Sequence, residues 1–342
     1  MIIVRAPVRI SFVGGGTDLE AFYRHSPGRV ISTAIDKYSY VTINRPPLIA
    51  KKVSASYAIQ EIVDHPSKLE NDRVREALLH FNILNNIHIG SFSDVPAKTG
   101  LGSSSSFSVA LMKGLYAAHG KRVDKREVAE AAAHLEINLV KEPIGKQDQY
   151  AAAFGGFNIF QFNSNGSVDV MPVRLDYKKR AAFENHILLF YTGIARAAAS
   201  VLTEQKANTE KNLDTMKAMA DSVFQFRDTL LSGNFRGLGE MLHEGWLKKK
   251  TLASNISNQM IDDFYATGTR YGAWGGKILG AGGGGCVLFI ASPEKHKEIR
   301  EAIMIVAKKH HLEDFAEVPV KFVQAGAEIL MNNDHAGRSA VV

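Results

Sequence analysis

The most informative stretch of this sequence is Lys98-Thr99-Gly100-Leu101-Gly102-Ser103-Ser104-Ser105-Ser106. A strand pattern at residues 87–92 precedes it, and a helical pattern at residues 107–116 follows it. Glycines permit a tight turn, and the first N–H groups of a helix have no partners within the helix, so such a segment attracts anions. The serine hydroxyls add donors and a ligand for Mg²⁺. A flexible linker or an extended helix cap is the alternative, but linkers seldom join a strand to an amphipathic helix. We therefore expect the segment to bind phosphate.

Two well-known motifs are absent from this segment. It lacks the Gly-x-x-x-x-Gly-Lys-Ser/Thr pattern of a Walker A loop, and it lacks the Gly-x-Ser-x-Gly pattern of a hydrolase elbow. We therefore expect its serines to bind a ligand and not to act as nucleophiles.

A second glycine cluster, at residues 280–285, matches the Gly-x-Gly-x-x-Gly fingerprint of dinucleotide-binding proteins. The context does not fit, because a strand pattern follows it and it lies near the end of the chain. A turn that passes close to a bound ligand and a purely structural turn both stay open.

Further candidates for chemistry are carboxylates. Gly14-Gly15-Gly16-Thr17-Asp18 combines a bare backbone loop with what we expect to be an exposed carboxylate, which could accept hydrogen bonds from a polyol. Asp148, predicted in a loop, could orient or deprotonate a substrate hydroxyl. Taken alone, Asp148 reads as a surface or capping residue, and Glu136 as a solvated residue on a helix.

Composition limits the class of protein. The chain has 342 residues, of which 45% are hydrophobic and 22% charged, as in ordinary globular proteins. No apolar run is long enough for a membrane helix, and no signal peptide is recognisable. The single cysteine, Cys286, suits a reducing cytoplasm. The net charge of +6 is dispersed, so we expect anionic small substrates and no nucleic acid or membrane partner.

The pattern of elements predicts an α+β protein in two halves, with a boundary that we set between domains 1–178 and 179–342. An Asp124/Glu127 capping box predicts a helix that runs to about Val140. Methionine and aromatic positions at helical spacing predict a long helix over residues 216–230. The expected strands lie at residues 2–4, 8–12, 38–43, 87–92, 155–162, 187–191, 277–279 and 286–290.

The three glycine clusters, in this order, resemble the motifs of the GHMP kinase superfamily, which includes galactokinases, homoserine kinases and mevalonate kinases. Ala6-Pro7-Val8-Arg9-Ile10 leads into the first cluster, and Pro96 precedes the second. The resemblance spans residues 4 to 290. It implies a two-lobed fold, with an N-terminal lobe that contains a left-handed βαβ unit, a ferredoxin-like C-terminal lobe and an active site between them.

The resemblance also implies roles for individual residues, with ATP and Mg²⁺ as cofactors. Asp148 resembles the catalytic aspartate and Arg9 its basic partner, while Ser104 and Glu136 resemble the Mg²⁺ ligands. The implied nucleotide-binding residues are Gly100, Leu101, Gly102, Ser103, Ser104, Ser105 and Ser106. The implied substrate-binding residues are Gly15, Gly16, Thr17, Asp18, Gly145, Tyr191, Arg196, Gly282 and Gly283.

One departure bears on the substrate. Galactokinases carry Glu-His where this chain has Gly15-Gly16, which argues against galactose. The Gly-Gly-Gly-Thr-Asp form, with Tyr191-Thr192-Gly193 and Arg196, is most similar to D-glycero-D-manno-heptose 7-phosphate kinases, which phosphorylate an anomeric hydroxyl. Arg196, Lys37 and Arg45 are candidates to bind the phosphate of such a sugar.

Three alternatives stay open at this point. A fucokinase-like or galactokinase-like enzyme would act on an unphosphorylated sugar, and a ligand sensor would keep the fold without catalysis. The expected ligands are a sugar phosphate and ATP, and a homodimer remains one option for the oligomeric state.

Overall fold

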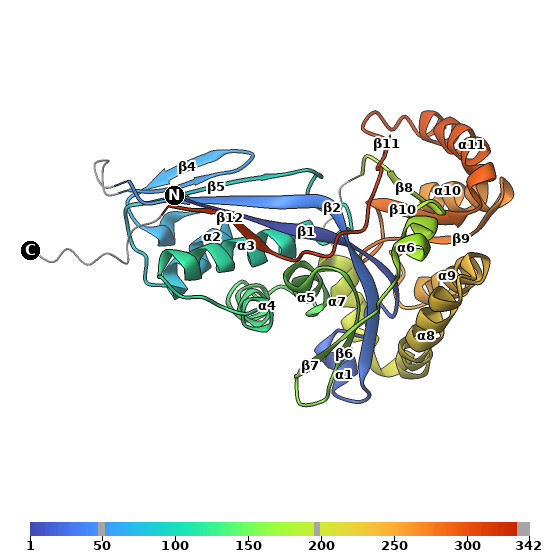
Figure 1. The fold of residues 1–342 in the computed structure, drawn as a ribbon, viewed down its shortest axis with the longest axis horizontal. Coiled ribbons are helices and arrows are strands. Elements are labelled where there is room, and N and C mark those ends of the chain that lie inside the picture. Colours follow the sequence, from blue (N-terminus) through green and yellow to red (C-terminus); the bar gives the residue numbers. More distant parts are fainter. Residues whose placement is uncertain (47–51, 195–198, 334–342) are drawn as a thin grey trace, which may run out of the picture.

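The computed structural model of the chain describes residues 1–46, 52–194 and 199–333. Two sheets with their helices form two lobes (Figure 1), so the predicted two-lobed α+β fold class is confirmed. No helix in these ranges has both the length and the apolar composition needed to cross a membrane.

The larger sheet has eight strands within the described ranges. Their order is β12-β1-β2-β5-β3-β4, and the first half of β2 also pairs with β6, which carries β7. The pairings are antiparallel except that of β3 with β5, which run parallel and are connected through β4 and α2. The strands are β1 (Ile2–Val13), β2 (Gly28–Asn44), β3 (Val53–Ser56), β4 (Gln60–Val63), β5 (Ile87–Ser93), β6 (Phe157–Phe162), β7 (Val168–Pro172) and β12 (Glu328–Asn332).

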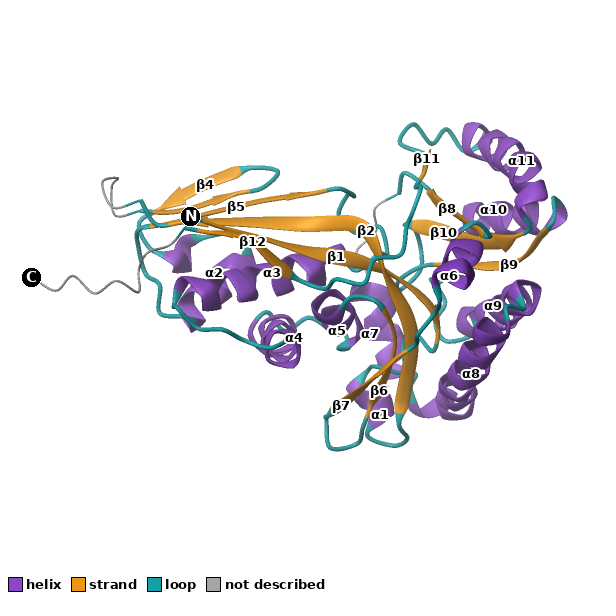
Figure 2. Ribbon diagram, viewed as in Figure 1, coloured by secondary structure: helices purple, strands orange, loops and turns teal. Residues whose placement is uncertain are grey.

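Helices cover one face of this sheet, as Figure 2 shows for α2, α3, α4 and α5. Helix α3 packs on β1 and β2, and it can approach closely because Gly114 faces Ile43 there: a Cβ at Gly114 would lie 2.7 Å from Ile43 Cδ1. The helices of this lobe are α1 (Glu20–Tyr23), α2 (Asp72–His80), α3 (Ser103–Ala118), α4 (Lys125–Ala133) and α5 (Gln147–Phe154), with a 3₁₀ turn at Pro66–Lys68.

The smaller sheet has the strand order β11-β8-β10-β9 and is antiparallel throughout. Along the chain its elements follow as β8, helices, β9, β10, α11 and β11, which is the ferredoxin-like arrangement that the resemblance implies. The strands are β8 (Ile187–Tyr191), β9 (Ala273–Ile278), β10 (Cys286–Ala291) and β11 (Ala316–Glu317). The helices are α6 (Tyr177–Glu184), α7 (Ala199–Ala207), α8 (Leu213–Ser232), α9 (Phe235–Lys250), α10 (Gln259–Arg270) and α11 (His296–Lys309), with 3₁₀ turns at Glu210–Asn212 and Pro293–Lys295.

The last described strand, β12 (Glu328–Asn332), pairs with the first strand of the large sheet. After the smaller sheet is complete, the chain returns to the larger one, where β12 pairs with β1 and Ile2 lies opposite Asn332. An isolated bridge between Ile35 and Phe322 marks its path. The boundary between residues 178 and 179 stays a prediction.

Several sequence predictions are confirmed in detail. Strand β8 has the predicted limits, α8 covers the predicted long helix, and the Asp124/Glu127 capping box is formed at α4. Other elements differ. The strands predicted at residues 2–4 and 8–12 form one strand, β1, and the strand predicted at residues 38–43 is the second part of β2, which begins at Gly28. Helix α3 begins at Ser103, before the predicted residue 107, because Gly102 takes the left-handed conformation and turns the chain directly into the helix. The helix that begins at α4 ends in a π-helical segment, His134–Leu139.

The two lobes share an aromatic cluster around Phe12 of β1. The ring of Phe12 lies 5.5 Å from that of Phe157, 5.4 Å from that of Phe183 and 5.3 Å from that of Phe226, measured between centroids. These rings come from β6, α6 and α8, so they join the large sheet to the helices of the smaller lobe.

We expect Phe12→Ala to lower the free energy of unfolding by about 3–5 kcal/mol, because it leaves a cavity among three packed rings. Phe92→Ala is the control, since Phe92 is 60% exposed on β5, and it should change stability far less. Urea denaturation of the two variants and the parent measures both effects. Equal losses for the two would contradict the assigned role of Phe12.

Candidate active site

A cavity of about 280 Å³ lies between the lobes. Its wall combines the start of α3, the loop after β1, the segment before α5 and the turn between β9 and β10. The residues that line it and carry the argument below are Arg9, Gly15, Gly16, Asp18, Arg73, Gly100, Gly102, Ser103, Ser104, Ser105, Glu142, Gly145, Gln147, Asp148, Gln205, Lys249, Lys277, Gly280 and Gly282.

One half of the cavity is the start of α3. Gly102 caps this helix in the left-handed conformation without a side-chain hydrogen bond, and the first helical bond runs from Ser106 N to Gly102 O. The N–H groups at Ser103–Ser105 therefore have no partner within the helix. They line the cavity together with their hydroxyl groups, and the helix dipole adds partial positive charge. This half is built to bind an anionic group.

The glycine turn between β9 and β10 packs against this loop. A Cβ at Gly280 would lie 2.6 Å from Gly100 Cα, and one at Gly285 would lie 2.5 Å from Thr99 O, so neither position tolerates a side chain without movement. Cys286 N donates to Thr99 O at 2.9 Å and fixes the contact. The turn therefore has a structural role in holding the loop before α3, and because Gly280 and Gly282 also line the cavity, its contact with a bound ligand stays a prediction.

Arg9 and Asp148 form an ion pair at the floor of the cavity. Arg9 Nε lies 2.8 Å and Arg9 Nη2 2.6 Å from Asp148 Oδ1, while Arg9 Nη1 donates to Gly100 O at 2.6 Å. Among the described residues, nothing donates to Asp148 Oδ2, which lies next to Gly102: a Cβ there would be 3.2 Å away. One carboxylate oxygen is held in place, and the other is free to accept a hydrogen bond from a ligand.

The other half of the cavity is organised by Asp18. Its carboxylate accepts hydrogen bonds from Gly16 N (3.1 Å), Gln147 N (3.3 Å) and Gln147 Nε2 (3.0 Å). A Cβ at Gly145 would overlap this carboxylate, so glycine is required there. Burial, together with the nearby Asp148 carboxylate, raises the pKa of Asp18 to about 6. The expectation that Asp18 is exposed is wrong: it is only 2% exposed, because the loop folds over it.

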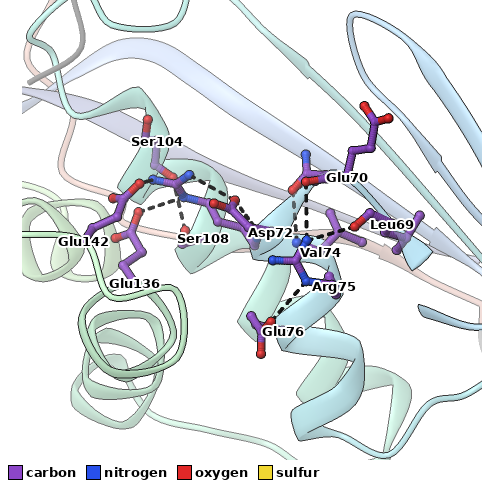
Figure 3. Close-up of polar contacts among 12 residues, drawn as sticks. Leu69, Glu70, Asp72, Val74, Arg75, Glu76, Ser104, Ser108, Glu136 and Glu142 are labelled. Carbon is purple, nitrogen blue, oxygen red and sulfur yellow. Dashed lines mark hydrogen bonds and ion pairs between the residues drawn. The ribbon is translucent and has the colours of Figure 1, made fainter. Parts of the chain in front are cut away.

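Glu136 does not line the cavity but lies behind its wall at the start of α3, where it is completely buried. Arg73 Nε donates to Glu136 Oε1 at 3.1 Å, and Arg73 Nη2 donates to Glu142 Oε1 at 2.6 Å. Figure 3 shows Ser104, Glu136 and Glu142 gathered close together. Burial raises the pKa of Glu136 above its ordinary value, although the Arg73 charge opposes this. The reading of Glu136 as a solvated residue is wrong, because the π-helical segment turns it inward.

This cluster has the composition of a magnesium site. Glu136, Glu142 and, at 3.7 Å, Asp72 face the one guanidinium of Arg73, so the Arg73 cluster carries an excess negative charge close to the start of α3. Carboxylate and hydroxyl oxygens are the ligands that Mg²⁺ takes in proteins. Glu136 is already engaged by Arg73 and by Gln149, whereas Glu142 lines the cavity. The residues fit a hard divalent cation, and Glu142 joins the two predicted ligands as a candidate.

The structure brings most of the predicted site residues to the cavity, and Asp148 lies in the first turn of α5, not in the predicted loop. Six predicted residues do not line the cavity: Thr17, Leu101, Ser106, Glu136, Tyr191 and Gly283. Thr17 and Ser106 use their hydroxyls for backbone carbonyls, and Gly283 N donates to Ile256 O. Lys37 and Arg45 lie away from the described lining as well, and Arg196 lies outside the described residues.

Sequence reasoning missed several polar residues of the wall, among them Arg73, Gln147, Gln205, Lys249 and Lys277. A signal for Lys249 was present. Leu238, Leu242 and Trp246 form the buried face of α9, and Lys249 continues that face at helical spacing. A lysine at a core position of a helix is unusual and indicates a special environment.

The buried Asp18 predicts a pH dependence of stability. Its pKa is about 6 in the folded protein and near 3.8 when exposed. Between these two pH values the folded protein holds the proton that the unfolded chain has lost. This group therefore makes the free energy of unfolding fall as pH rises through that window.

We expect Asp18→Asn to remove this dependence, so the variant's stability should fall less steeply than the parent's between about pH 4 and pH 6. Urea denaturation across that range measures the slopes. Asp214→Asn, at an exposed position of α8, is the matched control and should keep the parent slope. An unchanged slope in Asp18→Asn would contradict the assignment.

Comparisons with known proteins agree with this geometry. The family model described as GHMP kinases N terminal domain matches residues 71–156, and the one described as GHMP kinases C terminal matches residues 226–306. The chain is 27% identical over 329 residues to D-glycero-alpha-D-manno-heptose 7-phosphate kinase of Campylobacter jejuni, covering 92% of this chain and 96% of that one. It is 26% identical to the bifunctional fucokinase/GDP-fucose pyrophosphorylase of Arabidopsis thaliana, covering 93% of this chain but 32% of that one.

Solved structures share the fold. A D-glycero-D-manno-heptose 1-phosphate kinase from Bacteroides thetaiotaomicron superposes with a TM-score of 0.78 at 23% identity, covering 97% of this chain and 99% of that one. Galactokinase of Lactococcus lactis in complex with galactose has a TM-score of 0.75 at 18% identity, covering 96% and 95%. The matched segments contain the start of α3, Asp148 and the turn between β9 and β10, which together form the cavity. The chain therefore belongs to the GHMP kinase superfamily.

Proposed function

We propose that this protein is an ATP-dependent sugar kinase that transfers the γ-phosphoryl group to the anomeric hydroxyl of D-glycero-D-manno-heptose 7-phosphate. The observation that carries the proposal is the position of the Arg9–Asp148 pair. It lies between an anion-binding helix start on one side and the Asp18 loop on the other. A hydroxyl bound near Asp18 is thereby presented to a phosphate bound at the start of α3.

The nucleotide half supplies binding and electrostatic stabilisation. The N–H and hydroxyl groups of Ser103–Ser105 hold the phosphates, and charge that develops on the transferred group meets the positive end of α3. Ser104, with Glu136 or Glu142, would hold Mg²⁺, which neutralises phosphate charge when it is bound. The glycine turn at Gly280 keeps this loop in place.

Asp148 and Arg9 act on the acceptor hydroxyl. The hydroxyl oxygen attacks the γ-phosphorus, the bond to the bridging oxygen breaks, and ADP leaves with that electron pair. The hydroxyl proton passes toward Asp148 Oδ2, which accepts no other hydrogen bond from the described residues. Because Arg9 fixes this carboxylate in place, Asp148 orients the hydroxyl as well as receiving its proton. Arg9 also stabilises the developing alkoxide.

The loop at residues 14–18, called the acceptor loop below, supports a substrate other than galactose. Gly15 has open space where a side chain would project: a Cβ would meet Ser11 Oγ at 3.8 Å. Gly16 has a φ of +97°, and a Cβ there would meet Gln205 Nε2, so the histidine of the galactokinase Glu-His pair would be strained in this loop. Similarity over nearly the full length to the Campylobacter heptose 7-phosphate kinase supports a heptose phosphate as the acceptor.

A panel of sugars tests the proposed substrate. ADP release with Mg·ATP is measured for D-glycero-D-manno-heptose with and without its 7-phosphate, and for fucose, galactose and mannose. We expect the highest kcat/KM for the phosphorylated heptose. A higher value for fucose or galactose would assign the enzyme to unphosphorylated sugars. No release with any sugar would instead favour a sensor that has kept the fold.

We expect Asp148→Asn to lower kcat by about 10²–10⁴-fold, because the amide cannot accept the proton and no longer pairs with Arg9. The measurement is the initial rate of ADP release at saturating sugar and ATP. Asp228→Asn removes a carboxylate that is 63% exposed on α8 and should keep the parent kcat. A nearly unchanged kcat in Asp148→Asn would refute the assigned role.

A further inference from the structure

Two lysines in the cavity wall are buried without a carboxylate partner. Lys249, at the end of α9, is 5% exposed, and Lys277, in β9, is 6% exposed. Lys277 Nζ donates to Ser11 O at 3.0 Å and to Phe12 O at 2.8 Å, and Lys249 Nζ donates to Gly280 O. No salt bridge reaches either lysine from the described residues. Buried cations are normally paired, so these two indicate a missing anion.

Both ammonium groups keep donors for a ligand. An ammonium group has three N–H donors, of which Lys277 uses two and Lys249 uses one on the described carbonyls. Each lysine also lines the main cavity, so the unused donors lie where a ligand can reach them. The carbonyl bonds hold the two side chains in position without neutralising their charge.

The same wall of the cavity contains a further unused hydrogen-bond donor, the side-chain amide of Gln205. Gln205 of α7 is 2% exposed, and its Nε2 makes no hydrogen bond in the described part of the chain. This amide lies next to Gly16, in the loop at residues 14–18. An unsatisfied buried amide donor costs stability unless a ligand accepts from it. This observation is independent of the lysines and also points to an acceptor-rich ligand.

Electrostatics agree with the geometry. Burial and the charge of Arg9 lower the pKa of Lys249 to about 8, although Asp18 opposes the shift. Burial, Lys249 and Arg9 lower the pKa of Lys277 well below its ordinary value. Arg9 on β1, Lys277 on β9 and Lys249 on α9 thus carry positive charges that repel one another. A bound anion would relieve this repulsion.

We propose that Lys249, Lys277 and Gln205 form an anion subsite that binds the phosphate monoester group of the acceptor sugar. The proposal rests on the proposed function and names the residues that recognise the acceptor phosphate. A phosphate monoester offers several charged oxygens, which match the unused ammonium and amide donors.

The surroundings of the lysines favour an anion on the acceptor over ATP, although Lys249 also donates to Gly280 O in the turn that packs on the loop before α3. A second cavity of about 20 Å³, lined by both lysines and by Gly14 and Gly15, lies behind the acceptor loop. The nucleotide phosphates already have the unpaired N–H groups at the start of α3. Lys277 also donates to carbonyls of β1 immediately before the acceptor loop.

The test is the ratio of kcat/KM for phosphorylated and unphosphorylated heptose, measured for the parent, Lys249→Met and Lys277→Met. We expect the ratio to fall by about 10–100-fold in each variant, the range for loss of a hydrogen bond to a charged group. Lys248→Met, which removes the neighbouring exposed charge on the same helix, should keep the parent ratio. A KM for ATP that rises while the ratio stays constant would assign the lysines to the nucleotide and overturn the proposal.

The unfolding temperature of each variant is measured, because Lys277→Met leaves Ser11 O and Phe12 O without the ammonium donor. Methionine matches lysine in length and removes a buried charge, so Lys249→Met should unfold at a temperature no lower than the parent. An equal loss of kcat/KM for both acceptors, at an unchanged unfolding temperature, would indicate a positioning role and overturn the subsite.

A binding measurement separates this proposal from the proposed function. Inorganic phosphate is titrated by calorimetry into the full-length protein saturated with Mg²⁺ and a non-hydrolysable ATP analogue, so that the α3 half is filled. Weaker binding to Lys249→Met than to the parent supports the subsite even if no heptose is phosphorylated. Equal binding to both proteins overturns it, whatever the sugar panel shows.

Discussion

The site depends on one close contact between backbones. The turn at Gly280–Gly285 approaches Gly100 so closely that side chains are excluded from it, and Cys286 N fixes the contact by a hydrogen bond to Thr99 O. Through this contact the smaller lobe packs against the loop that precedes α3. Gly100 O in turn accepts a hydrogen bond from Arg9, and Arg9 pairs with the carboxylate of Asp148. On the proposed function, nucleotide binding, lobe packing and the orientation of the Asp148 carboxylate therefore depend on the same contact.

The interior of the site is unusually polar, and its charges are divided between the two halves. Asp18 and the Glu136–Arg73–Glu142 cluster contribute negative charge, while Lys249 and Lys277 contribute positive charge. Each buried group lowers stability when it is considered alone. Such groups persist in active sites because bound substrates complete their pairing. On the proposed function, the two substrates supply the missing counter-charges.

Local patterns predicted the framework well. The alternating run at Ile187–Tyr191 and the Asp124 capping box carry their structural information within a few neighbouring residues. Burial of the site residues could not be predicted in this way. Asp18 follows glycines and looks like an exposed turn, until Gln147 and Gly145 from a distant segment close over it. Lys249 lies in a run of three lysines, and only its register with Trp246 distinguishes it from its neighbours. Family resemblance located Asp148 and Glu136, which pattern alone assigned to the surface.

Pairing of β12 with β1 makes the large sheet depend on two segments that lie far apart in the sequence. Residues 2–5 of β1 pair with residues 328–332, and the whole smaller lobe lies between them along the chain. Until this pairing forms, the N–H and C=O groups on that part of β1 lack their strand partner. Contacts between such distant segments carry a large loop-closure cost and form slowly. The smaller lobe is thus the loop that the last pairing of the large sheet has to close.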